Sequence, residues 1–226
     1  MQLRPRLIEV AAPPGSAGAV VVLHGGASRR EPMRVRPAQL SVLRMIPIAR
    51  RVARAGQGRL AVFRLLNSRR GWDTSHTPVQ DARWALARVR DQLGGTVPIC
   101  LVGHSLGGRA ALLAAGEPQV ASVVALAPWV LPSDMPHGVD GKPILIIHGS
   151  RDRTASPARS RALEQRIPGA RVSYILVDGA SHAMLGHHNE FSGRAAEFAV
   201  GTLLSERERY PPAGDGPSKR STAARR

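Results

Sequence analysis

A G-x-S-x-G motif at residues 103–107 places Ser105 in a turn between an apolar run and a stretch rich in alanine and leucine. When a strand precedes this motif and a helix follows it, the turn exposes the serine hydroxyl as a nucleophile. Both elements are expected here: a buried strand at residues 99–103 and a helix after Ser105. The motif glycines let strand and helix pack where a Cβ atom would collide. Ser105 itself is expected in a strained backbone conformation.

A serine hydroxyl is a weak nucleophile at neutral pH, so it needs a general base that a carboxylate orients. Asp152 follows the apolar run at residues 143–149, and His182 lies in the loop after the run at residues 171–177. The order serine, acid, histidine along the chain is the one used by enzymes that carry the serine on such a turn. These residues therefore indicate acyl transfer through a covalent intermediate.

Other residues compete for two of these roles. Asp178 stands at the end of the strand that leads to His182, and Asp134 lies in the connection after the apolar run at residues 120–128, so both are alternatives to Asp152. The histidine pair at residues 187–188 is an alternative to His182, although it falls near the start of the last expected helix.

A metal site built from the three later histidines would lack a standard ligand spacing, so no metal is expected. His104 and His148 are expected to be structural residues at strand ends. Trp129 and Met184 lie next to the motif loops and are candidates for lining the substrate pocket, with core packing as the alternative.

The elements that would position these residues follow from the hydrophobic pattern. Short apolar runs alternate with longer helical patterns, which is typical of a mostly parallel sheet with helices on both faces. Strands are expected at residues 7–12, 19–24, 60–66, 99–103, 120–128, 143–149 and 171–177. Helices are expected at residues 38–54, 79–93, after Ser105, at 157–166 and at 190–204. Pro47 should kink or break the first of these helices.

The length of 226 residues favours a single domain, which we place at residues 1–209. Hydrophobic residues make up 43% of the chain and charged residues 21%, a balance that excludes wholesale disorder. Residues 210–226 cannot bury an apolar face and are expected to form a disordered basic tail. The single cysteine, Cys100, lies in an apolar run and is expected to be a small buried hydrophobe.

The formal net charge of +16 would attract nucleic acid non-specifically. However, the arginines are scattered along the chain, and few aromatic residues are available to stack on bases, so no specific nucleic-acid partner is expected. No apolar run is long enough to span a membrane, and the first residues lack the pattern of a secretory signal. A cytoplasmic location is therefore the default expectation.

Taken together, the serine turn, the acid and the histidine resemble the α/β-hydrolase superfamily over residues 18–205, in its small, capless, dienelactone-hydrolase-like bacterial form. The resemblance implies the α/β-hydrolase fold and a serine hydrolase that uses no cofactor. Ser105 would be the nucleophile, His182 the general base and then acid, and Asp152 the residue that orients the imidazole. The activity it implies is hydrolysis of a small-molecule ester or thioester, with a non-catalytic ligand-binding or interaction protein as the alternative.

A fourth match is the sequence His24-Gly25-Gly26, which is similar to the oxyanion loop of that superfamily. By this resemblance the backbone N–H groups of Gly26 and Leu106 would form the oxyanion hole. The segment after residue 66 departs from the usual pattern, because it lacks the expected acidic residue and glycine-rich turn. The connection between the strands at 120–128 and 143–149 is too short for a large helical cap, so an open site is expected.

Overall fold

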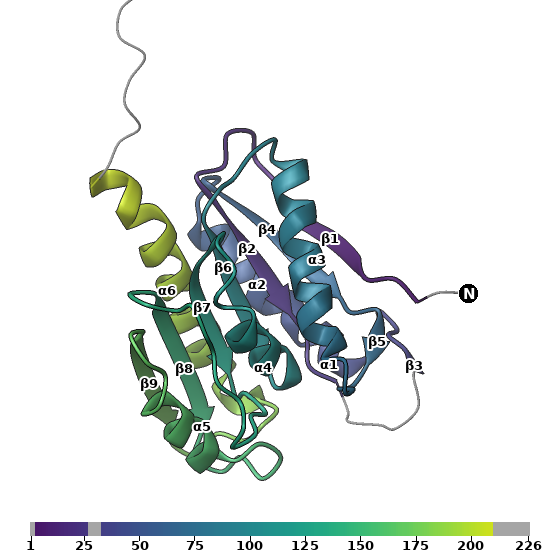
Figure 1. Cartoon of the computed structure of the whole chain (residues 1–226), viewed down its shortest axis with the longest axis vertical. Coiled ribbons are helices and arrows are strands. Elements are labelled where there is room, and N and C mark those ends of the chain that lie inside the picture. Colours follow the sequence, from purple (N-terminus) through teal and green to yellow (C-terminus); the bar gives the residue numbers. More distant parts are fainter. Residues whose placement is uncertain (1–2, 27–32, 210–226) are drawn as a thin grey trace, which may run out of the picture.

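Seven strands form one central sheet in the computed structural model, which describes residues 3–26 and 33–209 (Figure 1). The strands are β1 (Arg6–Ala11), β2 (Gly18–Leu23), β4 (Leu60–Leu66), β6 (Ile99–His104), β7 (Val120–Leu126), β8 (Pro143–Gly149) and β9 (Arg171–Val177). Their order in the sheet is β1-β4-β2-β6-β7-β8-β9. Only β1 runs antiparallel to its neighbour in this sheet, which confirms the expected mostly parallel architecture.

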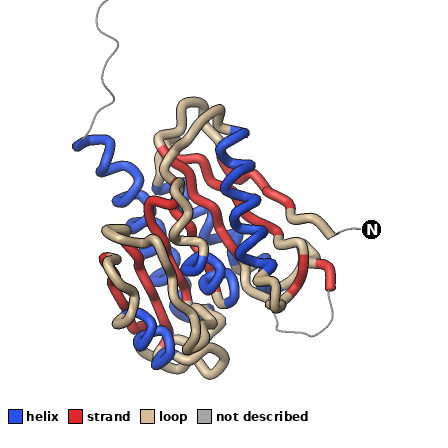
Figure 2. The backbone as a smooth tube through the Cα atoms, in the orientation of Figure 1, coloured by secondary structure: helices blue, strands red, loops and turns tan. Residues whose placement is uncertain are grey.

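Helices cover both faces of this sheet. They are α1 (Leu40–Leu43), α2 (Met45–Ala55), α3 (Thr77–Gln92), α4 (Leu106–Leu113), α5 (Pro157–Glu164), the short 3₁₀ turn η1 (Leu185–His187) and α6 (His188–Arg209). The helices α3, α4 and α5 lie in front of the sheet in the view of Figure 1, and α2 and α6 lie behind it. Figure 2 shows the same three layers as helix, strand and helix. Two short strands, β3 (Met33–Arg34) and β5 (Arg69–Arg70), pair separately with each other.

The central strands are apolar throughout because both of their faces are buried. All six residues of β2 are buried, and successive side chains point to opposite faces of the sheet. Val21 packs into the cluster formed with α3, α4 and α5, whereas Val20 packs into the cluster formed with α2 and α6. Cys100 belongs to the second cluster and is fully buried, as expected for a small hydrophobe. Burial raises the pKa of its thiol to about 12, so this side chain is inert.

The seven expected strands are the seven strands of the sheet, with ends that differ by one or two residues. The first expected helix is divided, but not at Pro47 as predicted: α1 and α2 meet at Arg44. Pro47 instead stands in the first turn of α2, where a missing N–H costs no helical hydrogen bond. The short pair β3 and β5 was not expected from the sequence.

The connection from β7 to β8, residues 127–142, contains neither helix nor strand. There is accordingly no helical cap between these strands, as the sequence predicts. No helix in the described part of the chain is long and apolar enough to cross a bilayer. The expected basic tail at residues 210–226 lies outside the described residues and stays a prediction.

Candidate active site

The turn between β6 and α4 holds Ser105 in a left-handed backbone conformation, with φ of 56°. A non-glycine residue at such a φ is strained, which agrees with the sequence-based expectation. Both motif glycines are required by packing. A Cβ atom on Gly103 would collide with the backbone carbonyl of Gly107, and one on Gly107 would collide with that of Leu23.

Three side chains from three loops meet at the carboxyl edge of the sheet. The Oγ atom of Ser105 lies 3.0 Å from Nε2 of His182, and Nδ1 of His182 lies 2.7 Å from Oδ2 of Asp152. Ser105 follows β6, Asp152 follows β8 and His182 follows β9, so the parallel order of the strands brings them to one rim. The three residues singled out in the sequence therefore form one continuous hydrogen-bonded row.

The proton positions in this row follow from its partners. A carboxylate only accepts hydrogen bonds, so Nδ1 of His182 carries a proton and donates to Asp152. In the neutral imidazole Nε2 is then free to accept the hydroxyl proton of Ser105. The His182 side chain is 17% exposed, whereas that of Asp152 is fully buried, so only the histidine faces solvent.

Asp152 is held ionised by hydrogen bonds that outweigh its burial. Burial alone raises the pKa of this carboxyl, but donors from His148, His182 and the backbone of Ala155 bring the pKa well below its usual range. Its Oδ1 atom accepts the backbone N–H groups of Thr154 at 2.8 Å and Ala155 at 2.9 Å. A permanently ionised, fixed carboxylate is suited to orienting an imidazole.

The alternative acids have other partners. Asp178 accepts a hydrogen bond from Ser150 at 2.9 Å. Asp134 forms a buried, bidentate ion pair with Arg109, with distances of 2.7 and 2.8 Å. The alternative histidines lie in η1 and at the first residue of α6, and no described hydrogen bond joins either of them to Ser105.

The loop after β2 lies against the serine turn. A Cβ atom on Gly25 would stand 3.0 Å from that of Ser105, and one on Gly26 would stand 3.1 Å from the backbone nitrogen of Gly71. Leu106 is the first residue of α4, where backbone N–H groups have no partner within the helix. The loop after β2 therefore packs against the turn that leads into α4.

A further histidine, His24, fixes the loop after β2. His24 donates from Nδ1 to the carbonyl of Gly25 and accepts the backbone N–H of Asn67 at Nε2, at 3.2 Å. Burial lowers the pKa of His24, as this neutral form requires. His24 thus joins the loop after β2 to the end of β4. Sequence reasoning noted His24 only as part of the glycine loop, since its contact with Asn67 is a tertiary one.

Comparison with known proteins identifies the fold. A model described as "Alpha/beta hydrolase family" matches residues 20–142, more than half of the chain. The chain belongs to the alpha/beta hydrolase family. No curated protein sequence matches it.

Solved structures share the alpha/beta hydrolase fold at low sequence identity. An alpha-beta serine hydrolase homologue from Coxiella burnetii aligns with a TM-score of 0.65 and 19% identity, covering 86% of this chain and 90% of that one. Est1E from Butyrivibrio proteoclasticus aligns with a TM-score of 0.64 and 16% identity, covering 88% and 93%. XC6422 from Xanthomonas campestris, described as a serine hydrolase without lid, aligns with a TM-score of 0.55 and 19% identity, covering 93% and 90%. Family membership and these neighbours support a hydrolytic function.

The two residues suggested for the substrate pocket of this alpha/beta hydrolase lie in different surroundings. Trp129 is half-buried and lines a hollow of about 300 Å³ beside Asp152. Its backbone N–H donates to the carbonyl of Ser105 at 3.1 Å, so it is fixed next to the serine turn. Met184 is only 2% exposed and packs in the cluster with Phe191, which favours the core-packing alternative.

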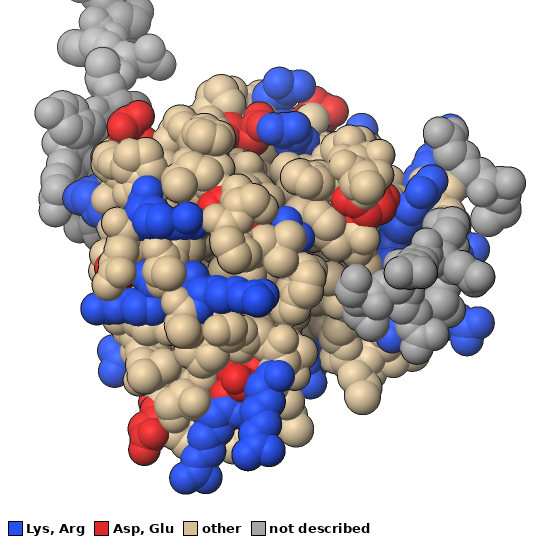
Figure 3. Space-filling model, turned by 60° about the horizontal axis from the view of Figure 1, so that its bottom comes forward, with Lys and Arg blue, Asp and Glu red and all other residues tan. Residues whose placement is uncertain are grey.

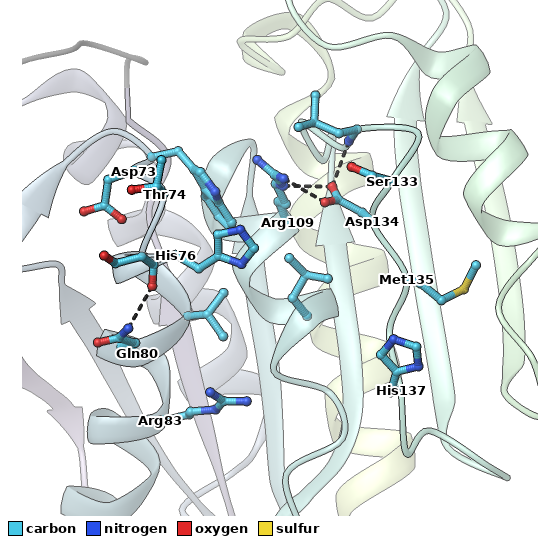
Figure 4. A pocket seen from close by; sticks show the side chains of 15 residues that line it. Asp73, Thr74, His76, Gln80, Arg83, Arg109, Ser133, Asp134, Met135 and His137 are labelled. Atoms are coloured by element: carbon cyan, nitrogen blue, oxygen red, sulfur yellow. Dashed lines mark hydrogen bonds and ion pairs between the residues drawn. The ribbon is translucent and has the colours of Figure 1, made fainter.

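A larger cleft of about 1110 Å³ lies over α4, whose residues Arg109 and Leu113 line it (Figure 4). Residues 72–83 form one wall, residues 131–137 form the other, and Arg109 lies between them. The Arg109 guanidinium stacks on the ring of Trp72, with 3.9 Å from Cζ to the ring centroid. Arg109 therefore ties both walls of the cleft to α4.

Every aspartate and arginine that lines this cleft has a partner of opposite charge. The pairs are Asp73 with Arg69, Arg83 with Glu117, and Asp134 with Arg109. The rest of the lining combines neutral polar side chains with apolar ones such as Val79 and Leu113. The cleft thus offers hydrogen bonds and apolar surface, and its charges are already compensated.

No group of three His, Cys, Asp or Glu side chains suitable for a metal ion occurs in the described ranges 3–26 and 33–209.

On the face shown in Figure 3, lysine and arginine side chains form several separate groups with acidic side chains between them. This distribution agrees with the scatter of arginines along the sequence.

Proposed function

We propose that this alpha/beta hydrolase cleaves carboxylic esters or thioesters through an acyl-enzyme formed on Ser105, with His182 as general base and Asp152 as its orienting acid. The observation that carries the proposal is the continuous row of two hydrogen bonds, 3.0 Å and 2.7 Å long, from Oγ through the imidazole to the carboxylate. A weak nucleophile, a base and an orienting acid are the parts that covalent acyl transfer needs.

In the first half-reaction, Oγ of Ser105 attacks the substrate carbonyl and its proton moves to Nε2 of His182. The buried Asp152 stabilises the imidazolium that forms. The backbone N–H groups of Gly26 and Leu106 stabilise the negative charge on the carbonyl oxygen. The tetrahedral intermediate collapses when the leaving alcohol or thiol departs with the proton from Nε2, and the acyl group remains on Ser105.

In the second half-reaction, water takes the place of the alcohol. His182 accepts a proton from the water as it attacks the acyl-enzyme, and it then returns that proton to Oγ of Ser105. The carboxylic acid leaves, and the site is restored. The substrate and one water molecule supply every atom of the products.

The surroundings of the row support small or flexible, uncharged substrates. Residues 127–142, between β7 and β8, form no helical cap, so in this proposal substrate enters from this side. Trp129 would contact the group nearest the reacting carbonyl. The cleft over α4 would accept a longer part of the substrate, and because its charges are paired, an uncharged chain suits it best.

The alternative is a protein that keeps the fold as a ligand receptor. The strained Ser105 favours catalysis, because the strain brings the hydroxyl into reach of His182 and a receptor would gain nothing from it. A fluorophosphonate probe separates the two, since it forms a phosphorus–oxygen bond with an activated serine and releases fluoride. We expect intact mass to show one label on the wild type and on Ser75→Ala, and none on Ser105→Ala. A wild type that is folded but takes no label would contradict the proposal that this protein is a serine hydrolase.

A further inference from the structure

A second histidine contacts the carboxylate of the proposed catalytic row. His148, the sixth residue of β8, is fully buried, and its Nε2 atom lies 3.1 Å from Oδ2 of Asp152. This is the same oxygen that accepts the hydrogen bond from Nδ1 of His182. Two imidazoles, one at the end of β8 and one in the loop after β9, therefore share one carboxylate oxygen.

The partners of His148 determine which nitrogen carries the proton. Nε2 faces two acceptors, Oδ2 of Asp152 and the backbone carbonyl of Ala155 at 3.2 Å, so Nε2 is the protonated nitrogen. On the other side of the ring, Nδ1 lies 2.7 Å from the hydroxyl of Ser160. The Ser160 hydroxyl also lies 2.9 Å from the carbonyl oxygen of Pro157, to which it donates, so each polar atom of the buried imidazole has a partner.

The carboxylate of Asp152 is consequently held at both oxygens. Oδ1 accepts two backbone N–H groups, from Thr154 and Ala155, and Oδ2 accepts the two imidazole N–H groups. Without His148, Oδ2 would accept a hydrogen bond only from His182, which is the residue that Asp152 has to orient. His148 supplies a second hydrogen-bond donor to Oδ2. This donor is held in the core and does not move with the loop that carries His182.

We infer that His148 is a positioning residue of the proposed hydrolase: its Nε2–H group fixes Oδ2 of Asp152 so that this carboxylate orients His182. The inference rests on the proposed function. The side chain does not touch the substrate and acts only through Asp152. A misplacement of reacting groups by a fraction of an ångström lowers turnover while leaving substrate binding intact.

The test compares two substitutions of His148 in hydrolysis of a chromogenic ester. His148→Leu removes the N–H donor, and we expect kcat to fall about ten- to a hundredfold with KM unchanged. His148→Gln keeps an amide N–H at the end of its side chain and is expected to recover most of kcat. Tyr174→Phe is the matched control, since its hydroxyl bonds the carbonyl of Pro157 at 3.1 Å on the far side of Ser160. We expect wild-type kinetics for it.

A measurement on the wild type keeps the inference testable if a variant does not fold. In ¹⁵N-histidine NMR spectra we expect His148 to carry a proton on Nε2. An Nε2 atom of His148 without a proton would overturn the inference, as would a folded His148→Leu variant with kcat within about twofold of the wild type. These results differ from a failure of the proposed function, in which the wild type shows no turnover that depends on Ser105.

Discussion

The Nε2 atom of His104 lies 3.0 Å from the backbone carbonyl oxygen of His182, so the residue before the proposed nucleophile holds the loop that carries the proposed base. A carbonyl oxygen only accepts, so Nε2 of His104 is the donor. The two rings also lie close, with centroids 4.9 Å apart. Burial, and then the charge of His182, lower the pKa of His104 to about 3.

This pKa predicts how stability depends on pH. Because the pKa of His104 is lower in the folded state than in the unfolded state, only the unfolded chain binds a proton between about pH 6.5 and pH 3. The wild type should lose free energy of unfolding as pH falls through this range, by up to about 1.4 kcal/mol per pH unit from this group. His104→Gln keeps a donor but does not titrate, so its denaturant unfolding should show a shallower pH dependence. Parallel curves for both proteins would contradict the assignment.

The proposed role of Asp152 predicts a large kinetic effect with a clear control. Asp152→Asn replaces an obligate acceptor by an amide that can present a donor to Nδ1 of His182, which favours the wrong imidazole tautomer. We expect kcat for ester hydrolysis to fall about 10³- to 10⁴-fold. Asp178→Asn, which changes an exposed residue bonded to Ser150, should keep wild-type kcat. Equal losses in both variants would contradict the proposed acid.

Much of the architecture could be predicted from the sequence because hydrophobic pattern and turn residues point to the same strands. The inner strands of the parallel sheet are buried on both faces, so each appears as a short apolar run bounded by turn residues. The serine turn has an equally local cause, since Gly103 and Gly107 stand where any side chain would meet backbone. Asp152 and His182 followed from their places after consecutive strands.

The features that were missed depend on contacts between distant segments. The strand pair β3 and β5 contains three arginines in four residues and has no apolar alternation. The bond from His104 to His182 spans 78 positions. His148 was expected only to be structural at a strand end. Its spacing of four residues from Asp152 was visible, but the contact arises because the turn after β8 folds the carboxylate back toward the strand.

The packing of the serine turn predicts a difference between two glycine substitutions. Gly107→Ala would place a methyl group against backbone atoms of Leu23 and His24, which cannot move without disturbing β2. We expect the free energy of unfolding to fall by about 1–3 kcal/mol or more. Gly95→Ala has open space around the added methyl group and should change it by less than about 0.5 kcal/mol. Denaturant unfolding followed by circular dichroism measures both, and equal stability of the two variants would contradict the close packing.

The cleft over α4 predicts a change in substrate selectivity. Leu113→Trp adds a large side chain to the cleft lining at the end of α4 away from Ser105, so it should obstruct only substrates that extend that far. We expect KM for uncharged esters with long chains to rise severalfold, while kcat/KM for the corresponding acetate stays unchanged. Steady-state kinetics over a series of chain lengths provides the measurement. If long and short esters respond alike, the substrate does not extend along α4, and the open hollow beside Trp129 would then accommodate the whole of it.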